Sequence, residues 1–324
     1  MTVRILTWIT IPLLVLVLAL ACGGDEASPS PSPSPTATAT KKPTPTRSPS
    51  PTPSPSPTPE PTPLPPVQGL DLTGSQTRQG GFVFVRYGGA ATAPVAYFRT
   101  IGYTMQPAGD VWYAYIGIPT DTAIATHPVE VWEGGSLLAS GAVSVVDGQF
   151  PTFEFEVPQS ATDLLADTTA IDLERQLVAN AVAAYTPTKY WSGPWITPTT
   201  GNISSEFGEL RSANGGPYYP HIGLDIANET GTPVYAAADG VVSLSQALQL
   251  FGNAVIIDHG VGVVAIYGHL DSAVVAAGQS VAKGQLIGYM GETGYVNGPH
   301  LHWEVCVHGV RVNGSLFTLG TVDP

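Results

Sequence analysis

Short apolar runs broken by glycine, proline and aspartate make up most of this chain, a pattern typical of β-strands joined by turns. Four of these runs cover residues 82–85, 111–116, 129–132 and 142–146. Their spacing predicts a small β-sandwich with an immunoglobulin-like arrangement. This region holds a single histidine, His127, and no cluster of reactive side chains, so it predicts a spacer or a binding module.

The same pattern continues in the C-terminal part of the chain. Residues 234–245, 253–258, 263–267 and 300–307 are further short runs of this kind, punctuated by glycine. We therefore predict four strands there, in a predominantly antiparallel β-sheet with a site in a groove.

Apolar residues recur at helical spacing between about residues 170 and 184, after Asp167, which can cap the start of a helix. We therefore expect a mainly β protein in three parts. They are a β-sandwich domain over residues 67–160, a helical connector over 161–194 and an antiparallel β-sheet domain over 195–324.

The N-terminus follows neither pattern. Arg4 precedes an apolar run over residues 5–21 that ends at Cys22, which is typical of a secretory signal. Residues 1–22 resemble a bacterial lipoprotein signal, in which the cysteine is lipidated. An uncleaved membrane anchor is the alternative, although the run is slightly short for a span. Both interpretations put the remaining chain outside the cytoplasm and tethered to the membrane, while a secreted form is also open.

Residues 23–66 are a low-complexity tract of repeated Ser-Pro and Thr-Pro. The tract has almost nothing apolar to bury, so we predict a disordered, extended linker that gives the folded domains reach.

Amino-acid composition and net charge limit the kinds of molecule that this protein is expected to bind. The chain has 324 residues, of which 43% are hydrophobic, and a formal net charge of -13 from 12 basic and 25 acidic residues. Because no basic stripe is interleaved with aromatic residues, a nucleic acid partner is not expected. Cys22 and Cys306 are the two cysteines, so a disulfide framework is not expected if Cys22 carries lipid. Oligomeric state is left open by the sequence.

Six of the seven histidines fall in the predicted second domain, where three segments carry the candidate chemistry. They read His-Ile-Gly-Leu-Asp at 221–225, Tyr-Gly-His-Leu at 267–270 and His-Leu-His at 300–302. A catalytic zinc ion typically has three protein ligands drawn from histidine and carboxylate, with one position open. This count is met by His221, Asp225 and His302, which leaves His269 and His300 as unligated imidazoles beside the metal.

These three segments, in this order, resemble the lysostaphin-type zinc metallopeptidases, which cut peptidoglycan peptides. The similarity extends to residues 205–208, 231–240, 253–260 and 281–285, and covers nearly the whole second domain. It implies a zinc-dependent endopeptidase that hydrolyses cross-links or stem peptides of peptidoglycan on the cell-wall side of the membrane.

The resemblance also implies a role for each histidine. His221, Asp225 and His302 match the ligands of one Zn²⁺ per chain, and His269 and His300 match the catalytic histidines. A neutral imidazole can take a proton from water and return it to the leaving amine. We favour His300 as this base and His269 as the group that orients water or stabilises the oxyanion, although the sequence does not decide between them.

Two other function classes are open at this point. A non-catalytic regulator of another hydrolase would share the fold, but such relatives have lost ligands, and this chain retains them all. A biotinyl or lipoyl carrier is suggested by the hairpin around Lys283, which lacks the neighbours typical of such carriers. A carrier also has no use for clustered histidines.

The remaining polar residues near the site receive weaker interpretations. Glu304 shares a strand face with His300 and His302, so it is an acceptor for a ligand, a salt-bridge partner or a solvated carboxylate. Cys306 is expected to be a buried free thiol. The tyrosines of the loop before the first ligand, Tyr218 and Tyr219, either help an oxyanion or simply pack. Structural roles are expected for two further histidines, His259 and His308.

Overall fold

The computed structural model describes residues 67–320. The predicted signal at 1–22 and the predicted linker at 23–66 lie outside these residues, so both stay predictions. Among the described helices, none has the length and apolar character needed to cross a bilayer.

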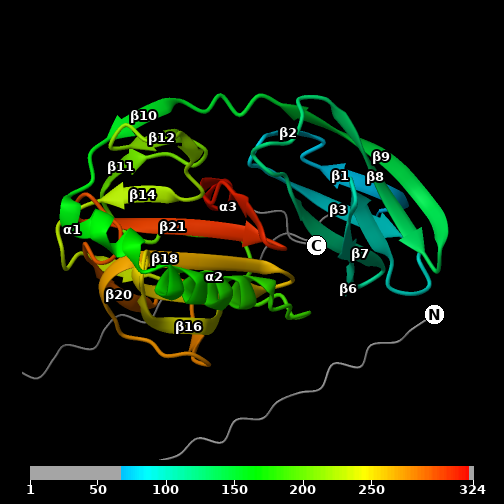
Figure 1. Cartoon of the computed structure of the whole chain (residues 1–324). Coiled ribbons are helices and arrows are strands. Elements are labelled where there is room, and N and C mark those ends of the chain that lie inside the picture. Colours follow the sequence, from blue (N-terminus) through cyan, green and yellow to red (C-terminus); the bar gives the residue numbers. More distant parts are fainter. Residues whose placement is uncertain (1–66, 321–324) are drawn as a thin grey trace, which may run out of the picture. The chain divides into compact units, whose positions relative to one another are not determined.

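Residues 69–146 form two β-sheets around a shared core (Figure 1). Val83 and Val85 on one sheet and Val129 and Val131 on the other are fully buried in this core, whereas Phe84, between the first two, is buried in a cluster with residues of the second domain. The first sheet has the order β1 (Gly69–Thr73), β3 (Phe82–Gly88), β7 (Val111–Gly117) and β6 (Gln106–Ala108). The second has the order β2 (Gln76–Arg78), β9 (Ser136–Val146), β8 (Thr126–Glu133), β4 (Val95–Phe98) and β5 (Ile101–Thr104). The four predicted runs are strands, and the immunoglobulin-like arrangement stays a prediction.

The connecting segment begins with a short strand, β10 (Thr152–Phe155), and continues through α1 (Gln159–Thr162), the 3-10 helix η1 (Asp163–Ala166) and α2 (Thr168–Ala183). The predicted helix and its cap are confirmed, because Asp167 Oδ1 accepts a hydrogen bond of 2.9 Å from the amide of Ala170. Val178 and Val182 of α2 pack against the second domain's sheet, along which the helix lies in Figure 1.

A ten-stranded antiparallel sheet forms the second domain. Its main path runs through β11 (Asn202–Ser205), β14 (Leu224–Ala227), β21 (His300–Val307), β18 (Val263–Ala273), β17 (Gly252–Gly260), β16 (Gly240–Leu248) and β19 (Ser280–Val281). Three further strands attach to this path, namely β15 (Pro233–Tyr235), β20 (Leu286–Met290) and β22 (Val310–Val312). A short helix, α3 (Ser315–Thr318), follows. The predicted fold class, mainly β with antiparallel sheets, is confirmed.

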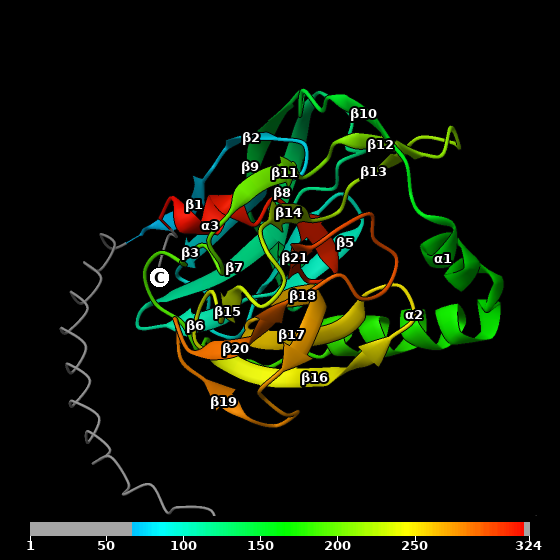
Figure 2. The ribbon, with the colours of Figure 1, turned by 90° about the vertical axis from the view of Figure 1, so that its left-hand side faces the viewer.

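A smaller sheet brings the connector to the second domain. In it, β12 (Leu210–Ala213) pairs with β10 on one side and with β13 (Tyr219–Pro220) on the other (Figure 2). The β10–β12 pairing is parallel and joins residues 58 positions apart in the chain.

The prediction of one strand over residues 234–245 is wrong. The chain leaves β15 after Tyr235 and enters β16 at Gly240, so two strands with different partners share this run. Between them the amide of Ala236 donates to Gln285 O and the amide of Ala237 donates to the hydroxyl of Tyr267. These contacts satisfy the backbone without a neighbouring strand, an arrangement that alternating apolar residues cannot reveal.

Candidate metal centre

Strand pairing brings the predicted ligands together. Asp225 on β14 lies directly opposite His302 on β21, and Gly268 on β18 lies opposite His302 on the other side. His221 precedes β14 and is held by backbone bonds to residues 208 and 209. Residues separated by up to 81 positions in the sequence therefore meet at the centre of one sheet.

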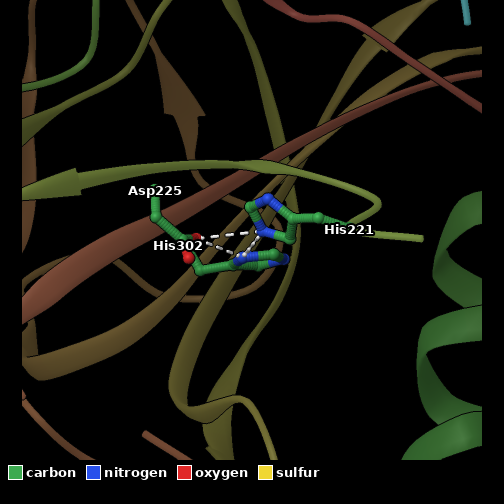
Figure 3. A group of neighbouring side chains, drawn as sticks. All are labelled: His221, Asp225 and His302. Atoms are coloured by element: carbon green, nitrogen blue, oxygen red, sulfur yellow. Dashed lines mark hydrogen bonds and ion pairs between the residues drawn. The ribbon is translucent and has the colours of Figure 1, made fainter. Parts of the chain in front are cut away.

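Three side chains, His221, Asp225 and His302, point toward one another (Figure 3). His302 Nδ1 lies 2.7 Å from Asp225 Oδ1, His221 Nε2 lies 3.2 Å from the same oxygen, and the two ring nitrogens are 3.1 Å apart. All three residues are buried, with exposed fractions of 8% or less. Ligand atoms of a tetrahedral zinc site lie roughly 3.3 Å apart at the usual bond lengths of about 2.0 to 2.2 Å, so this spacing fits such an ion.

The glycine of the first motif, Gly223, leaves room for the imidazole of His302. A Cβ atom at this position would lie 2.6 Å from His302 Cε1 and 2.8 Å from His302 Nε2. Any side chain there would displace the imidazole, so glycine is required for His302 to face Asp225.

The outward-facing atoms of both imidazoles are also bonded. His221 Nδ1 donates to the carbonyl oxygen of Glu206 at 2.9 Å, and His302 Nε2 donates to Glu304 Oε1 at 3.0 Å. When each ring is neutral, its proton is thereby held on the outer nitrogen, so the inner nitrogen has a lone pair with which it can bind a metal. Glu304 also accepts from Arg311 at 3.0 Å and is fully buried, so its roles as acceptor and as salt-bridge partner are both confirmed, whereas a solvated carboxylate is excluded.

Arg211 completes the surroundings of Asp225, and no pattern in the sequence indicates this role. Its Nη2 donates to Asp225 Oδ2, and its Nε donates to Ser205 Oγ at 3.0 Å. The hydroxyl of Ser205 in turn bonds Glu209. One oxygen of Asp225 is thus taken by Arg211 while the other faces the histidines.

The site is built to hold a cation. Burial raises the pKa of Asp225, but the neighbouring His302 and His221 outweigh it and hold that pKa well below its ordinary value. Burial lowers the pKa of His302, but Asp225 and Glu304 outweigh it and raise that pKa to about 9. Two buried carboxylates therefore favour positive charge at this position, whether a proton or a metal ion supplies it.

The other two predicted histidines lie beside this centre. The ring centroid of His269 is 4.8 Å from that of His300 and 5.7 Å from that of His302. His300 Nε2 lies 3.6 Å from Asp225 Oδ2. All five predicted site residues are thus gathered in one place.

His269 is held in an uncommon backbone conformation. Its φ angle is 62°, in the left-handed region that non-glycine residues rarely adopt. The conformation is held by its amide, which donates to Phe251 O at 2.7 Å, and by its Nδ1, which donates to Thr293 O at 2.9 Å. Such strain, over-determined by neighbouring bonds, is common at functional sites.

Two cavities open on either side of the centre. The first has a volume of about 220 Å³ and is walled by Ile222, Leu250 and Phe251 beside His269. The second has a volume of about 160 Å³ and reaches His300 and Asp225. Three side chains line both cavities, namely Arg211, Tyr219 and Tyr295. A groove therefore crosses the site, as an extended peptide substrate would require.

The other polar residues near the site have separate roles. The hydroxyl of Tyr218 donates to Glu154 at 2.5 Å, away from the histidines, whereas Tyr219 lines the groove. Cys306 is a buried free thiol, as predicted. His259 is fully buried within β17, and His308 packs against tyrosine rings in the turn between β21 and β22, so both predicted structural roles are confirmed.

Known proteins resemble this chain over the same region. Residues 219–314 match peptidase family M23. The peptidoglycan DD-endopeptidase ShyA of Vibrio cholerae is 48% identical over 94 residues, which are 29% of this chain and 22% of ShyA. The DD-carboxypeptidase/endopeptidase Mpg of Neisseria meningitidis is 42% identical over 121 residues, which are 37% of this chain and 28% of Mpg. The chain thus spans about a quarter of the length of these relatives.

One solved structure is similar over most of the described chain. It is a crystal structure of a peptidase M23 from Pseudomonas aeruginosa, with a TM-score of 0.56 and 27% sequence identity. The similarity covers 74% of this chain and 93% of that one, so it extends beyond the family match into the preceding segments.

Proposed function

Because residues 219–314 form a domain of peptidase family M23, the lysostaphin-type metallopeptidases, we propose that this protein is a zinc-dependent endopeptidase that hydrolyses peptide bonds of peptidoglycan. The observation that carries the proposal is the convergence of His221, Asp225 and His302 on one point, with His269 and His300 beside it. We assign the first three to a single Zn²⁺ per chain and the last two to catalysis.

Zinc, when bound by these three residues, would polarise the scissile carbonyl and make a water molecule acidic enough to attack it near neutral pH. The nitrogen and oxygen donor set, the buried negative charge and the bonded outer atoms of both imidazoles all suit this ion.

His300 is proposed as the general base. Its Nδ1 donates to Gly298 O at 2.9 Å, so Nε2 carries a lone pair and can accept a proton from water. Burial lowers the pKa of His300 and keeps the ring neutral beforehand, while nearby Asp225 opposes that effect and stabilises the protonated ring. The proton can then be returned to the leaving amine.

His269 is proposed to orient the attacking water. Burial and the neighbouring His300 and His302 hold its pKa well below the ordinary value, so it stays neutral. Since its Nδ1 donates to Thr293 O, its Nε2 can accept a hydrogen bond from water but cannot donate one to an oxyanion. Of the two roles considered for His269, water orientation is therefore favoured.

The proposal is tested by metal analysis and peptidoglycan digestion with the full chain. Asp225→Ala is expected to lose both bound zinc and activity. His300→Ala is expected to keep zinc but to release peptide fragments at least about 100-fold more slowly, the usual contribution of a general base. His127→Ala, in the sandwich, is the matched control and should resemble the wild type. A zinc-loaded, intact protein that releases no fragments would contradict the proposal.

A non-catalytic regulator is not favoured, because the ligand set and both further histidines are complete. We retain as proposals the domain limits at 67–160, 161–194 and 195–324, although β10 at 152–155 falls within the first of these limits and pairs with β12 in the third. We also retain a lipid or anchor tether through residues 1–66. In this arrangement the peptidase domain faces the cell wall, which agrees with the peptidoglycan named in the relatives' descriptions.

A further inference from the structure

Strand β10 lies beside the candidate active site although it belongs to the connecting segment. Phe153 and Phe155 of β10 line the same 160 Å³ cavity as Asp225 and His300. The family match begins only at residue 219, so this wall comes from outside the matched region.

The backbone of β10 is firmly attached to β12. Residues 152–155 pair in parallel with residues 210–213, and the amide of Leu210 donates to Pro151 O at 2.8 Å. At the other end Asn214 accepts from the amide of Val157 at 2.8 Å through Oδ1, and its own amide donates to Phe155 O at 2.9 Å. Bonds at both ends hold the strand in one register.

The side chains of β10 divide by face. Phe153 and Phe155 are two residues apart and share one face, where their rings stack with centroids 6.0 Å apart and planes 14° apart. Glu154 points the other way and accepts from the hydroxyl of Tyr218. This bond ties β10 to the glycine-containing loop before His221.

The stacked rings form an apolar surface that is still open to a ligand. Phe153 is 43% exposed, although burial of a large apolar side chain is favourable. A ligand that covered its ring would therefore be stabilised. Phe155 extends this surface toward the candidate metal ligands. The guanidinium carbon of Arg211, which bonds Asp225, lies 5.7 Å from the ring centroid of Phe155. The apolar surface therefore runs from solvent-exposed Phe153 to Phe155, which lies beside Arg211.

We propose that β10 is a specificity-determining wall of the substrate groove, in which Phe153 and Phe155 contact an aliphatic side chain on one side of the scissile bond. The inference rests on the proposed function and deepens it. Methyl and methylene groups would be removed from water against the rings. An acidic side chain would instead lose hydration next to the apolar rings.

The test uses the full, zinc-loaded chain and two series of synthetic peptidoglycan-type peptides. In each series one position is Ala or Asp, placed before the scissile bond in one series and after it in the other. The wild type is expected to prefer Ala in one series only. Phe153→Ala and Phe155→Ala are each expected to raise KM for that Ala peptide about tenfold, with kcat and zinc content retained, and to reduce the preference.

Two further variants separate contact from folding. Phe153→Leu keeps an apolar side chain and should retain most of the preference. Leu165→Ala removes an apolar side chain with the same 43% exposure from η1, which lines neither cavity, and should leave all constants unchanged. An unchanged Ala-to-Asp preference in both phenylalanine variants would overturn the inference.

Failure of the proposed function would look different. If the wild type cleaved no peptide, binding of the same fluorescently labelled peptides would be measured by anisotropy. Weaker binding of the Ala peptide to Phe153→Ala than to the wild type would still support the wall. Equal binding by both proteins would refute it.

Discussion

At the scale of single residues, Arg211 decides how Asp225 is presented. Its guanidinium takes Oδ2 of Asp225, which leaves Oδ1 facing the nitrogens of His221 and His302. Arg211 is mostly buried and also bonds Ser205, so its position is fixed on both sides. Partners of this kind orient a metal ligand without touching the metal.

Replacing Arg211 with alanine should therefore lower zinc affinity about 10- to 100-fold, as measured by competition with a chelator. Arg211→Lys should lie between, because lysine keeps the charge but not the forked geometry. Removal of a nearby cation would by itself favour a divalent ion. An increase in affinity would thus show that repulsion, rather than positioning, is the larger effect of Arg211.

The matched control is Arg175→Ala, which breaks an exposed ion pair with Asp172 on α2. Both partners of that pair are more than 70% exposed, so the change should leave zinc affinity unaltered.

At this scale the sequence predicts His302 as a candidate metal ligand but does not predict the role of Arg211. Histidines with metal-ligand spacing are informative because few other roles need that residue type in that pattern. An arginine has many roles, and Arg211 acquires its own only when folding lets this β12 residue reach Asp225 on β14. Ser205 belongs to the motif at residues 205–208, yet its role likewise depends on the folded arrangement.

At the scale of elements, α2 supports the loop that precedes β17 and lies beside the candidate site. Glu174 on this helix is only 4% exposed, and its carboxylate accepts from the amide of Leu250 at 2.6 Å. The same loop accepts two bonds from the site, from the amide of His269 to Phe251 O and from the amide of Tyr295 to Leu250 O. A helix outside the family match thus helps to fix the strained His269.

Glu174→Ala should lower kcat while zinc content stays at the wild-type level, because the loop positions His269 but carries no ligand. The free energy of unfolding should fall by about 2 to 3 kcal/mol, since backbone amides lose a buried charged acceptor. Glu174→Gln retains an acceptor oxygen and should be milder in both respects. Peptide hydrolysis, metal analysis and urea unfolding provide the three measurements.

Asp172→Ala on the exposed face of α2 is the control and should change stability by less than about 0.5 kcal/mol. If Glu174→Ala lost stability but kept full kcat, α2 would be a structural helix alone.

Elements were predictable where local pattern decides them. The helix after Asp167 and the strand at 300–307 were identified because a cap and a strict alternation are visible in the sequence. Strand β10 was missed, because its four residues become a strand only through pairing with β12. The break between β15 and β16 was missed for the same reason, as each strand has a different distant partner.

At the scale of the described molecule, apolar contacts join the sandwich strands to the second domain. Phe82 stacks on Phe317 with ring centroids 4.7 Å apart, and Tyr115 lies 5.6 Å from Trp191. His308 belongs to this junction, since its ring lies 5.1 Å from Tyr103 of β5 and 5.7 Å from Tyr185 after α2. A histidine therefore sits where three segments of the chain meet.

Acid should weaken this arrangement through His308. Burial lowers the pKa of His308 from 6.5 to about 4, so the folded protein keeps it neutral while the unfolded chain takes up a proton below about pH 6.5. Its contribution to stability is therefore complete above pH 6.5 and is lost as the pH falls toward 4. Between pH 8 and pH 5 the loss is about 2 kcal/mol at most.

His308→Phe keeps an aromatic ring between the tyrosines but cannot be protonated. Its free energy of unfolding should therefore fall less than that of the wild type between pH 8 and pH 5, by up to about 2 kcal/mol. Denaturant unfolding of both proteins at equal zinc concentration measures this difference. The pH dependence of metal binding is common to both proteins and cancels in the comparison. Tyr185→Phe, which alters the same junction without removing a histidine, should follow the wild-type curve. Parallel curves for the wild type and His308→Phe would mean that acid acts elsewhere, and the fully buried His259, whose pKa burial also lowers to about 4, would be the next residue to replace.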